Sequence, residues 1–197
     1  MIVHAAFALA DVPVETELVG WDDMGWSSQT LKDVNPLGQV PTLVLPDGQV
    51  MTESSAMLLH LKDIRLDLTW IPDADSPIRT QFLHWLMFLN AAVYPTFTYG
   101  DVPGRWVAED EAAAKLLRQG TNQHRESLYQ YMEAHSGQPW FLGETMTAVD
   151  FYFMTMRFWR PGLEWFAEHY PKLDAIGLAV NELPVVKDVI EGYFPEG

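Results

Sequence analysis

The sequence contains no cysteine among its 197 residues. Disulfide bonds, thiolate metal sites and a catalytic cysteine within this chain are therefore excluded. The six histidines show no metal-binding spacing, because there is no H-E-x-x-H segment and no pair of them lies four residues apart. We find neither a phosphate-binding loop nor the nucleophile turn of serine hydrolases. The sequence thus predicts no metal site and none of these reaction types.

Positive charge is also scarce, with 12 Lys and Arg against 27 Asp and Glu and a formal net charge of −15. Nucleic acids and anionic membrane surfaces both attract basic residues, so we expect neither as a partner. The longest apolar tract, residues 82–97, is broken by His84, Asn90 and Pro95 and is too short to cross a bilayer. The apolar start lacks a basic region and a cleavage site, which argues against a signal peptide. We expect a cytoplasmic protein.

The first third of the chain has the pattern of a small α/β unit. An alanine-rich start predicts a helix, alternation of apolar and polar residues predicts a strand, and Pro-Asp-Gly predicts a turn. The expected elements are a helix at 2–10, a strand at 12–19, a helix at 27–34, a strand at 41–45, a turn at 46–48, a second hairpin arm at 50–51 and a helix at about 54–62.

From Ser76 onward the sequence reads as helices. Ser76 followed by proline is a helix start, and Thr147 with Asp150 three residues later predicts a capping box with a structural role. Helices are expected near 77–99, 106–134, 148–159, 173–181 and 185–192. We therefore predict an α/β domain at 1–66 and an all-α domain at 76–197.

Two short motifs in the α/β part suggest a ligand site. The first is Gln39-Val40-Pro41, where proline opens a strand and removes one ladder donor. If the Val40–Pro41 bond is cis, the N–H and C=O of Val40 are free to pair with an extended peptide-like ligand. Most X–Pro bonds are trans, so this alternative stays open.

The second motif is Glu53-Ser54-Ser55 at the start of the helix at 54–62. Helix N-termini favour anions, Ser54 adds a hydroxyl donor, and Glu53 could accept a hydrogen bond from an ammonium group. The pair would fit the head group of an amino acid. An ordinary N-cap serine is the alternative. Together the two motifs would hold a short peptide with a free α-amino acid end.

The segment NPLGQVPTLVLPDGQVMTESSAM, residues 35–57, strongly resembles the glutathione-binding half of the thioredoxin-like domain of glutathione transferases. The resemblance covers nearly the whole chain. It includes SPIR at 76–79, the set Gly143, Thr147 and Asp150, and VYPTFTYGDVPGRW at 93–106, which is similar to a subgroup of bacterial proteins of this family. It implies a thioredoxin-like N-terminal domain followed by an all-α domain.

The same resemblance implies a ligand and the residues that hold it. Glutathione would be the co-substrate, an apolar electrophile the second substrate, and the protein a homodimer. Val40, before a cis Pro41, would face the cysteinyl part of glutathione. Glu53 and Ser54 would hold its γ-glutamyl end, and Gln39 would approach its glycyl end.

The sequence departs from the family pattern at its front. Family members begin with a βαβ unit, and the turn after its first strand carries the Tyr, Ser or Cys that activates the glutathione sulfur. Here residues 2–15 match the first helix and second strand, and no earlier strand or activating residue is found. The start of the gene could be placed too late, the domain could be degenerate, or residues 1–10 could replace the strand. We favour a shortened or degenerate front, and the catalytic residue is unknown.

Resemblance also suggests a pocket for the second substrate. Its candidates are Tyr94, Phe97, Thr98, Tyr99, Arg105 and Trp159. Aromatic residues at helical spacing are more often core, so most of these residues have a packing alternative. The same alternative weighs against a hydroxyl from Tyr94, Thr98 or Tyr99 as a substitute activator. Trp26 could flank the glycyl end of the ligand, and Arg157 or Arg160 could instead pair with buried carboxylates.

Two functions therefore compete. The first is a glutathione transferase that conjugates glutathione to an apolar electrophile. The second is a non-catalytic binding or interaction module on the same fold, which would explain the missing thiol activator.

Overall fold

The computed structural model describes residues 1–19 and 28–194, and contacts divide the chain into two compact units. The first unit comprises Met1–Ile71 together with Leu183–Gly197, and the second comprises Pro72–Glu182. The ranges 1–66 and 76–197 stay a prediction as domain limits. The contacts place the last helix, which we expected in the all-α part, with the first unit. No described helix is long and apolar enough to cross a membrane.

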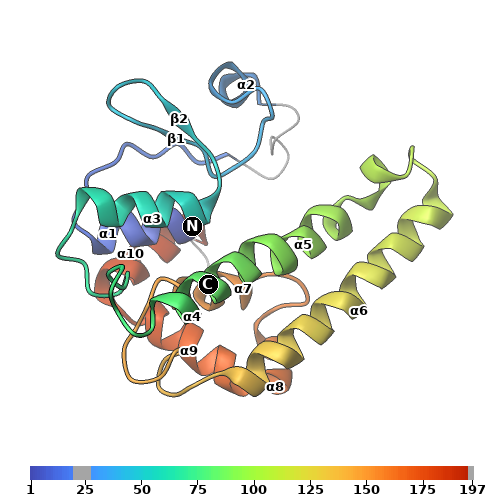
Figure 1. Cartoon of the computed structure of the whole chain (residues 1–197). Coiled ribbons are helices and arrows are strands. Elements are labelled where there is room, and N and C mark those ends of the chain that lie inside the picture. Colours follow the sequence, from blue (N-terminus) through green and yellow to red (C-terminus); the bar gives the residue numbers. More distant parts are fainter. Residues whose placement is uncertain (20–27, 195–197) are drawn as a thin grey trace. The chain divides into compact units, whose positions relative to one another are not determined.

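The first unit is built from four helices and a hairpin in its described residues. They are α1 (Ile2–Leu9), α2 (Gln29–Val34), β1 (Leu43–Val44), β2 (Val50–Met51), α3 (Ser54–Ile64) and α10 (Pro184–Tyr193). Helix α1 packs against both α3 and α10 (Figure 1). Alanine favours the helix and lets neighbours approach closely, and Ala5, Ala6 and Phe7 are buried there. On α10, Val186 and Val189 are buried.

The predicted hairpin is confirmed. Strands β1 and β2 are antiparallel, with Leu43 opposite Met51. In the turn, the N–H of Leu45 donates to the carbonyl of Gln49 at 2.9 Å, and Gly48 has φ +86°, a conformation that glycine adopts without strain. The predicted helices at 2–10, 27–34 and 54–62 correspond to α1, α2 and α3.

The predicted strand at 12–19 is wrong, because these residues form no strand. Within the described chain the sheet consists of β1 and β2 alone, and no strand lies beside residues 12–19. A strand is stabilised by its ladder partners, so an alternating pattern without a neighbour does not produce one. Val14 and Leu18 are accordingly exposed. This agrees with the expectation of an incomplete sheet.

The second unit is helical throughout its described elements. They are α4 (Arg79–Phe88), the π-helical turn η1 (Leu89–Val93), α5 (Tyr94–Asp101), the 3-10 helix η2 (Pro103–Trp106), α6 (Glu111–His135), α7 (Asp150–Met156), α8 (Leu163–His169) and α9 (Pro171–Asn181). The expected helix at 77–99 is thus three successive segments, and α8 was not predicted. Helices α5 and α6 pack side by side (Figure 1).

Helix α7 forms the centre of the second unit. All of its residues are buried, and it packs on α9. Gly177 on α9 permits the close approach, since a Cβ there would lie 2.8 Å from the main-chain carbonyl of Phe153. Arg157, which follows α7, donates through Nε to Asp174 of α9 at 2.8 Å. One of the two arginines expected to pair with a carboxylate therefore does so here.

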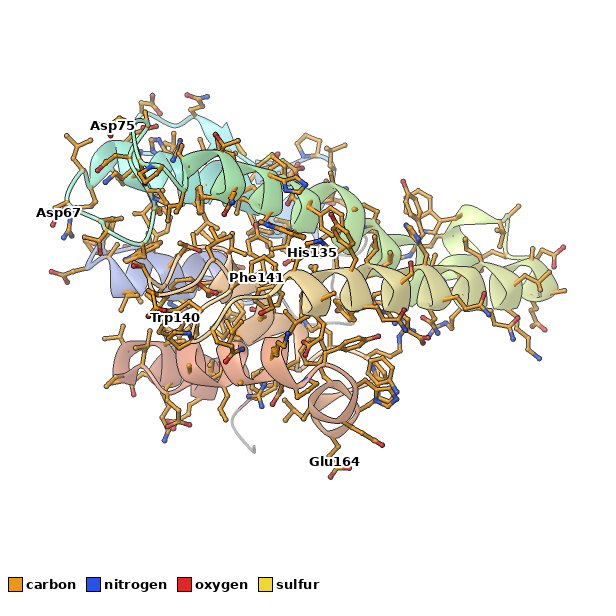
Figure 2. All side chains as sticks on the ribbon, turned by 60° about the horizontal axis from the view of Figure 1, so that its bottom comes forward. Asp67, Asp75, His135, Trp140, Phe141 and Glu164 are labelled. Atoms are coloured by element: carbon orange, nitrogen blue, oxygen red, sulfur yellow. The ribbon has the colours of Figure 1, made fainter. Side chains whose placement is uncertain are left out.

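The start of α7 depends on the carboxylate of Asp150, which is fully buried. One oxygen accepts from the N–H of Thr147 at 2.6 Å and from its hydroxyl at 3.3 Å. The other accepts from the N–H of Phe141 at 2.9 Å, in the segment between α6 and α7 (Figure 2). The predicted bond between Asp150 and the N–H of Thr147 is confirmed, whereas the predicted N-cap at Thr147 is wrong, because the helix begins at Asp150 with Val149 as its N-cap. The bond to Phe141 connects the carboxylate to a second segment.

We predict that Asp150→Asn lowers the free energy of unfolding at pH 7 by about 1–3 kcal/mol. The asparagine NH2 group is a donor, and it would face N–H or O–H groups that now donate to the carboxylate. Burial raises the pKa of Asp150 from 3.8 to about 6, against the hydrogen bonds that lower it. Between these values the folded state keeps a proton that the unfolded state releases, so this group's contribution to stability falls as pH rises from about 4 to 6.

Urea unfolding across this pH range checks the prediction. Asp150→Asn should lose that component of the pH dependence, whereas Asp188→Asn, on an exposed position of α10, should keep it. An unchanged pH profile in Asp150→Asn would contradict the assignment.

Candidate functional site

Asn35 organises the turn that precedes β1, and its side chain is buried, with 4% of the residue exposed. Its amide nitrogen donates to the carbonyl of Gln39 at 3.1 Å and to the hydroxyl of Thr42 at 3.0 Å. Its amide oxygen accepts from the N–H of Leu37 at 3.1 Å, and its main-chain carbonyl accepts from the N–H of Gly38 at 2.7 Å. One buried side chain therefore fixes the whole turn from Asn35 to Thr42.

This turn presents Val40, which is 47% exposed. The Val40–Pro41 bond is cis, as the family resemblance implied. The carbonyl of Gln39 is occupied by Asn35 and also by the hydroxyl of Thr42 at 2.7 Å. The N–H and C=O of Val40, by contrast, have no hydrogen bond to any described residue. Val40 thus offers one main-chain donor and one acceptor at the surface.

Glu53 and Ser54 stand at the start of α3. Glu53 is exposed and has φ +68°, a left-handed conformation that costs a non-glycine residue about 1–3 kcal/mol. Such strained residues cluster at ligand sites, where the surrounding structure holds them. Ser54, the first residue of α3, is buried together with Ser55. The positive end of the helix dipole lies here.

The hairpin brings the two predicted motifs to one place. Because Leu43 pairs with Met51 in an antiparallel ladder, Pro41 and Glu53 follow at the same open end of the hairpin. The site candidates Gln39, Val40 and Pro41 lie on one side of this end, and Glu53 and Ser54 lie on the other. We name this end, formed by residues 39–41 and 53–54, the hairpin mouth.

The six candidates for the second-substrate pocket fall into two groups in the second unit. Tyr94 and Phe97 of α5 meet Trp159, with ring centroids 5.1 and 4.7 Å apart. Tyr99 instead packs on Trp106 at 4.8 Å. The second group, at the other end of α5, holds Thr98, Tyr99 and Arg105, all exposed.

Tyr94 carries a strongly perturbed phenol. Burial raises its pKa well above the ordinary value, and the neighbouring Tyr152 and Tyr129 raise it further. The phenol therefore stays protonated at neutral pH and can act only as a hydroxyl group, not as a phenolate base. Trp26 lies outside the described residues. No cluster that could hold a metal ion occurs among the described residues.

The sequence did not single out Asn35, Arg125 and Tyr129, three buried residues with polar side-chain groups. Asn35 has a local signal, because an Asn before Pro is a typical turn residue whose side chain bonds the backbone two residues on. Arg125 and Tyr129 of α6 are buried in the second unit, and the Arg125 guanidinium lies 4.3 Å from the ring centroid of Phe97. Their only sequence signal is a polar residue on the inward side of a helix.

The chain was compared with known proteins. A family model for the N-terminal domain of glutathione S-transferase matches residues 1–64. The uncharacterized GST-like protein YncG of Escherichia coli K12 is 40% identical over 192 residues, covering 96% of this chain and 91% of that protein. Glutathione S-transferase GstA of Escherichia coli O157:H7 is 27% identical over 160 residues, covering 80% and 75%.

A solved structure supports the fold. The glutathione transferase homologue from Sulfitobacter, crystallised with bound glutathione, is 19% identical and has a TM-score of 0.83, covering 98% of this chain and 92% of that one. The predicted fold class is confirmed: a thioredoxin-like N-terminal part with a reduced sheet and an all-helical part.

We predict that Asn35→Ala lowers the free energy of unfolding of the first unit by about 1–3 kcal/mol, because the turn loses the three hydrogen bonds of the buried Asn35 amide. Urea unfolding measures this loss. The matched control is Gln39→Ala, which removes an exposed side chain from the same turn and should change stability by less than about 0.5 kcal/mol. Equal effects of the two substitutions would contradict the central place of Asn35.

Proposed function

The chain belongs to the glutathione S-transferase family, and on that premise we propose that it binds glutathione at the hairpin mouth. The observation that carries the proposal is the ladder register, with Leu43 opposite Met51, which sets Val40 and Ser54 at one end of the hairpin. The motif at 39–41 can then bind the backbone of a tripeptide, and the motif at 53–54 can bind its amino acid end.

In this proposal, Val40 holds the middle of the tripeptide. Its N–H and C=O, which have no hydrogen bond to a described residue, pair with the cysteinyl backbone as an added strand would. The turn fixed by Asn35 keeps these two groups in place before the ligand arrives. Preorganisation of this kind raises affinity because little ordering is left for the binding step.

The γ-glutamyl end is assigned to the start of α3. Its carboxylate meets the helix N-terminus and the Ser54 hydroxyl, and its ammonium group meets the Glu53 carboxylate. The glycyl end is assigned to Gln39, whose side chain is exposed beside Val40. The left-handed conformation of Glu53 lies between β2 and α3, directly before Ser54, which supports assigning both residues to one end of the ligand.

We further propose that the glutathione sulfur attacks an apolar electrophile. We assign this second substrate to the second unit, at the rings of Tyr94, Phe97 and Trp159 and at the exposed residues Thr98, Tyr99 and Arg105. A thiolate at neutral pH needs a donor to stabilise it. The residue that supplies this donor is unassigned.

The alternative is a module on the same fold that binds without conjugating. It is favoured by one observation: among residues 1–19 and 28–194 nothing pairs with residues 12–19 as a strand, and the sheet there consists of two short strands. We propose a homodimer in the cytoplasm in either case. Light scattering of the purified chain tests the dimer.

We predict that Ser54→Ala weakens glutathione binding about tenfold or more, since a hydrogen bond to a charged group contributes about 1.5–3 kcal/mol. Titration followed by tryptophan fluorescence and repeated by calorimetry measures the affinity. Ser127→Ala, an exposed serine of α6, is the matched control and should leave affinity unchanged. Unchanged binding by folded Ser54→Ala would remove Ser54 from the site.

We also predict that the chain consumes a chloronitrobenzene in the presence of glutathione, measured by absorbance of the conjugate. The rate should rise with pH as the thiol ionises. If glutathione binds but no conjugate forms at any glutathione concentration or pH tested, the non-catalytic module replaces the transferase.

A further inference from the structure

The inward face of α6 changes character along the helix. Its first part is polar, and it becomes apolar toward the C-terminal end at Met132. Arg118, Asn122, Arg125 and Tyr129 are spaced four, three and four residues apart, which is the spacing of a single helix face. A face that packs in a helical unit is usually apolar, so this polar stretch requires an explanation.

Two polar atoms on this face are buried and unpaired. The Nη1 atom of Arg125 and the hydroxyl of Tyr129 have no hydrogen-bond partner among the described residues. Arg125 is 3% exposed and Tyr129 is 1% exposed. Arg125 donates through Nη2 to the Asn122 amide oxygen at 3.0 Å, which leaves its other terminal nitrogen unused. Nearly all buried polar groups in folded proteins are paired, so two unpaired ones on one helix face call for a partner that the described residues do not supply.

Positive charge gathers at the same place, although the chain as a whole is strongly acidic. Arg160 donates to the Asn122 amide oxygen at 2.6 Å and pairs with the carboxylate of Asp101 at 2.5 Å. Arg118 donates to the main-chain carbonyl of Asp101 at 2.5 Å. Arg118, Arg125 and Arg160 thus lie near the carboxylate of Asp101, which is already paired with Arg160. The other acidic residue whose charge acts on Arg125 is Glu126, which is exposed. The local excess of positive charge favours an anion.

A cluster of aromatic side chains adjoins the unpaired donors. The Arg125 guanidinium lies over the ring of Phe97, Phe97 contacts Trp159, and Trp159 contacts Tyr94. Arginine stays protonated in proteins, and burial raises the pKa of Tyr129, so both unpaired groups are donors at neutral pH. A ligand that satisfies them must bring an acceptor together with an apolar body.

We propose that Arg125 and Tyr129 bind the carboxylate of an aromatic or unsaturated carboxylic acid, whose apolar part packs on Phe97 and Trp159. A carboxylate has two acceptor oxygens, one for the guanidinium and one for the phenol. The inference deepens the proposed function, and rests on it for the role of this acid as the second substrate. The second substrate is then an electrophile with an apolar body and one negative charge.

Titration of the full chain with cinnamate, without glutathione, tests the site. Tryptophan fluorescence reports binding because Trp159 belongs to the aromatic cluster beside Arg125, and calorimetry gives the affinity independently. Cinnamamide, which has the same body without the charge, is the matched ligand. We expect saturable binding of cinnamate, at least about tenfold tighter than that of cinnamamide. Equal affinities for the two ligands, or no binding of cinnamate, would overturn the proposal.

Two substitutions of tyrosine on α6 sharpen the test. Tyr129→Phe removes only a hydroxyl without a protein partner, so the chain should stay as stable as the original while cinnamate affinity falls about tenfold. Tyr131→Phe makes the same chemical change two residues on, where the ring contacts Trp85 and His135, and should leave cinnamate affinity unchanged. A stability loss in Tyr129→Phe with unchanged affinity would assign the hydroxyl to the fold and refute its role in binding.

The guanidinium is tested with Arg125→Met, which should abolish the preference for cinnamate over cinnamamide. Glutathione affinity, measured in the same variants, should be unchanged. Failure of glutathione binding in the original chain would refute the proposed function alone, because cinnamate binding is measured without glutathione. A chain that binds and conjugates glutathione yet shows no preference for cinnamate would refute this inference alone.

Discussion

A buried polar side chain is unfavourable unless it is hydrogen-bonded, and this constraint shapes both units of the chain. In the first unit the Asn35 side chain meets it by bonding to three groups of its own turn, and in the second Asp150 meets it with three donors from two segments. The backbone in both places adopts the path that saturates one side chain. Arg125 and Tyr129 do not meet the constraint among the described residues, which is why they point to a ligand while Asn35 and Asp150 do not.

The first unit depends on helix packing more than on its sheet. Each strand has two residues, whereas α1, α3 and α10 bury a continuous set of apolar side chains. The hairpin is therefore stabilised locally. Its turn at 46–48 and the register of β1 with β2 determine which residues lie opposite each other at the hairpin mouth. Ligand-binding geometry in this unit follows from a few short-range hydrogen bonds, and these form without a wide sheet.

Local signals in the sequence predicted local structure well. Alanines indicated α1, Pro-Asp-Gly indicated the hairpin turn, and Thr147 with Asp150 indicated the start of α7. The cis Val40–Pro41 bond followed from the family resemblance and not from the residues alone. The sequence could not predict features that depend on a distant partner: the absence of a strand at 12–19, the extra residue in the π-helical turn η1, and the inward polar face of α6. Periodicity identifies a buried face, but it does not say what that face meets.

The packing of α10 against α1 has a consequence for how the protein is made. Both helices belong to one unit, yet α1 is synthesised before α10, with the whole second unit between them. The second unit is thus continuous in sequence and can fold as soon as it leaves the ribosome, since domains generally fold as units during synthesis. Until Val186 and Val189 emerge, the side of α1 that packs on α10 is uncovered in the nascent chain. Nascent chains that end before α10 therefore expose apolar surface that can lead to aggregation or chaperone capture.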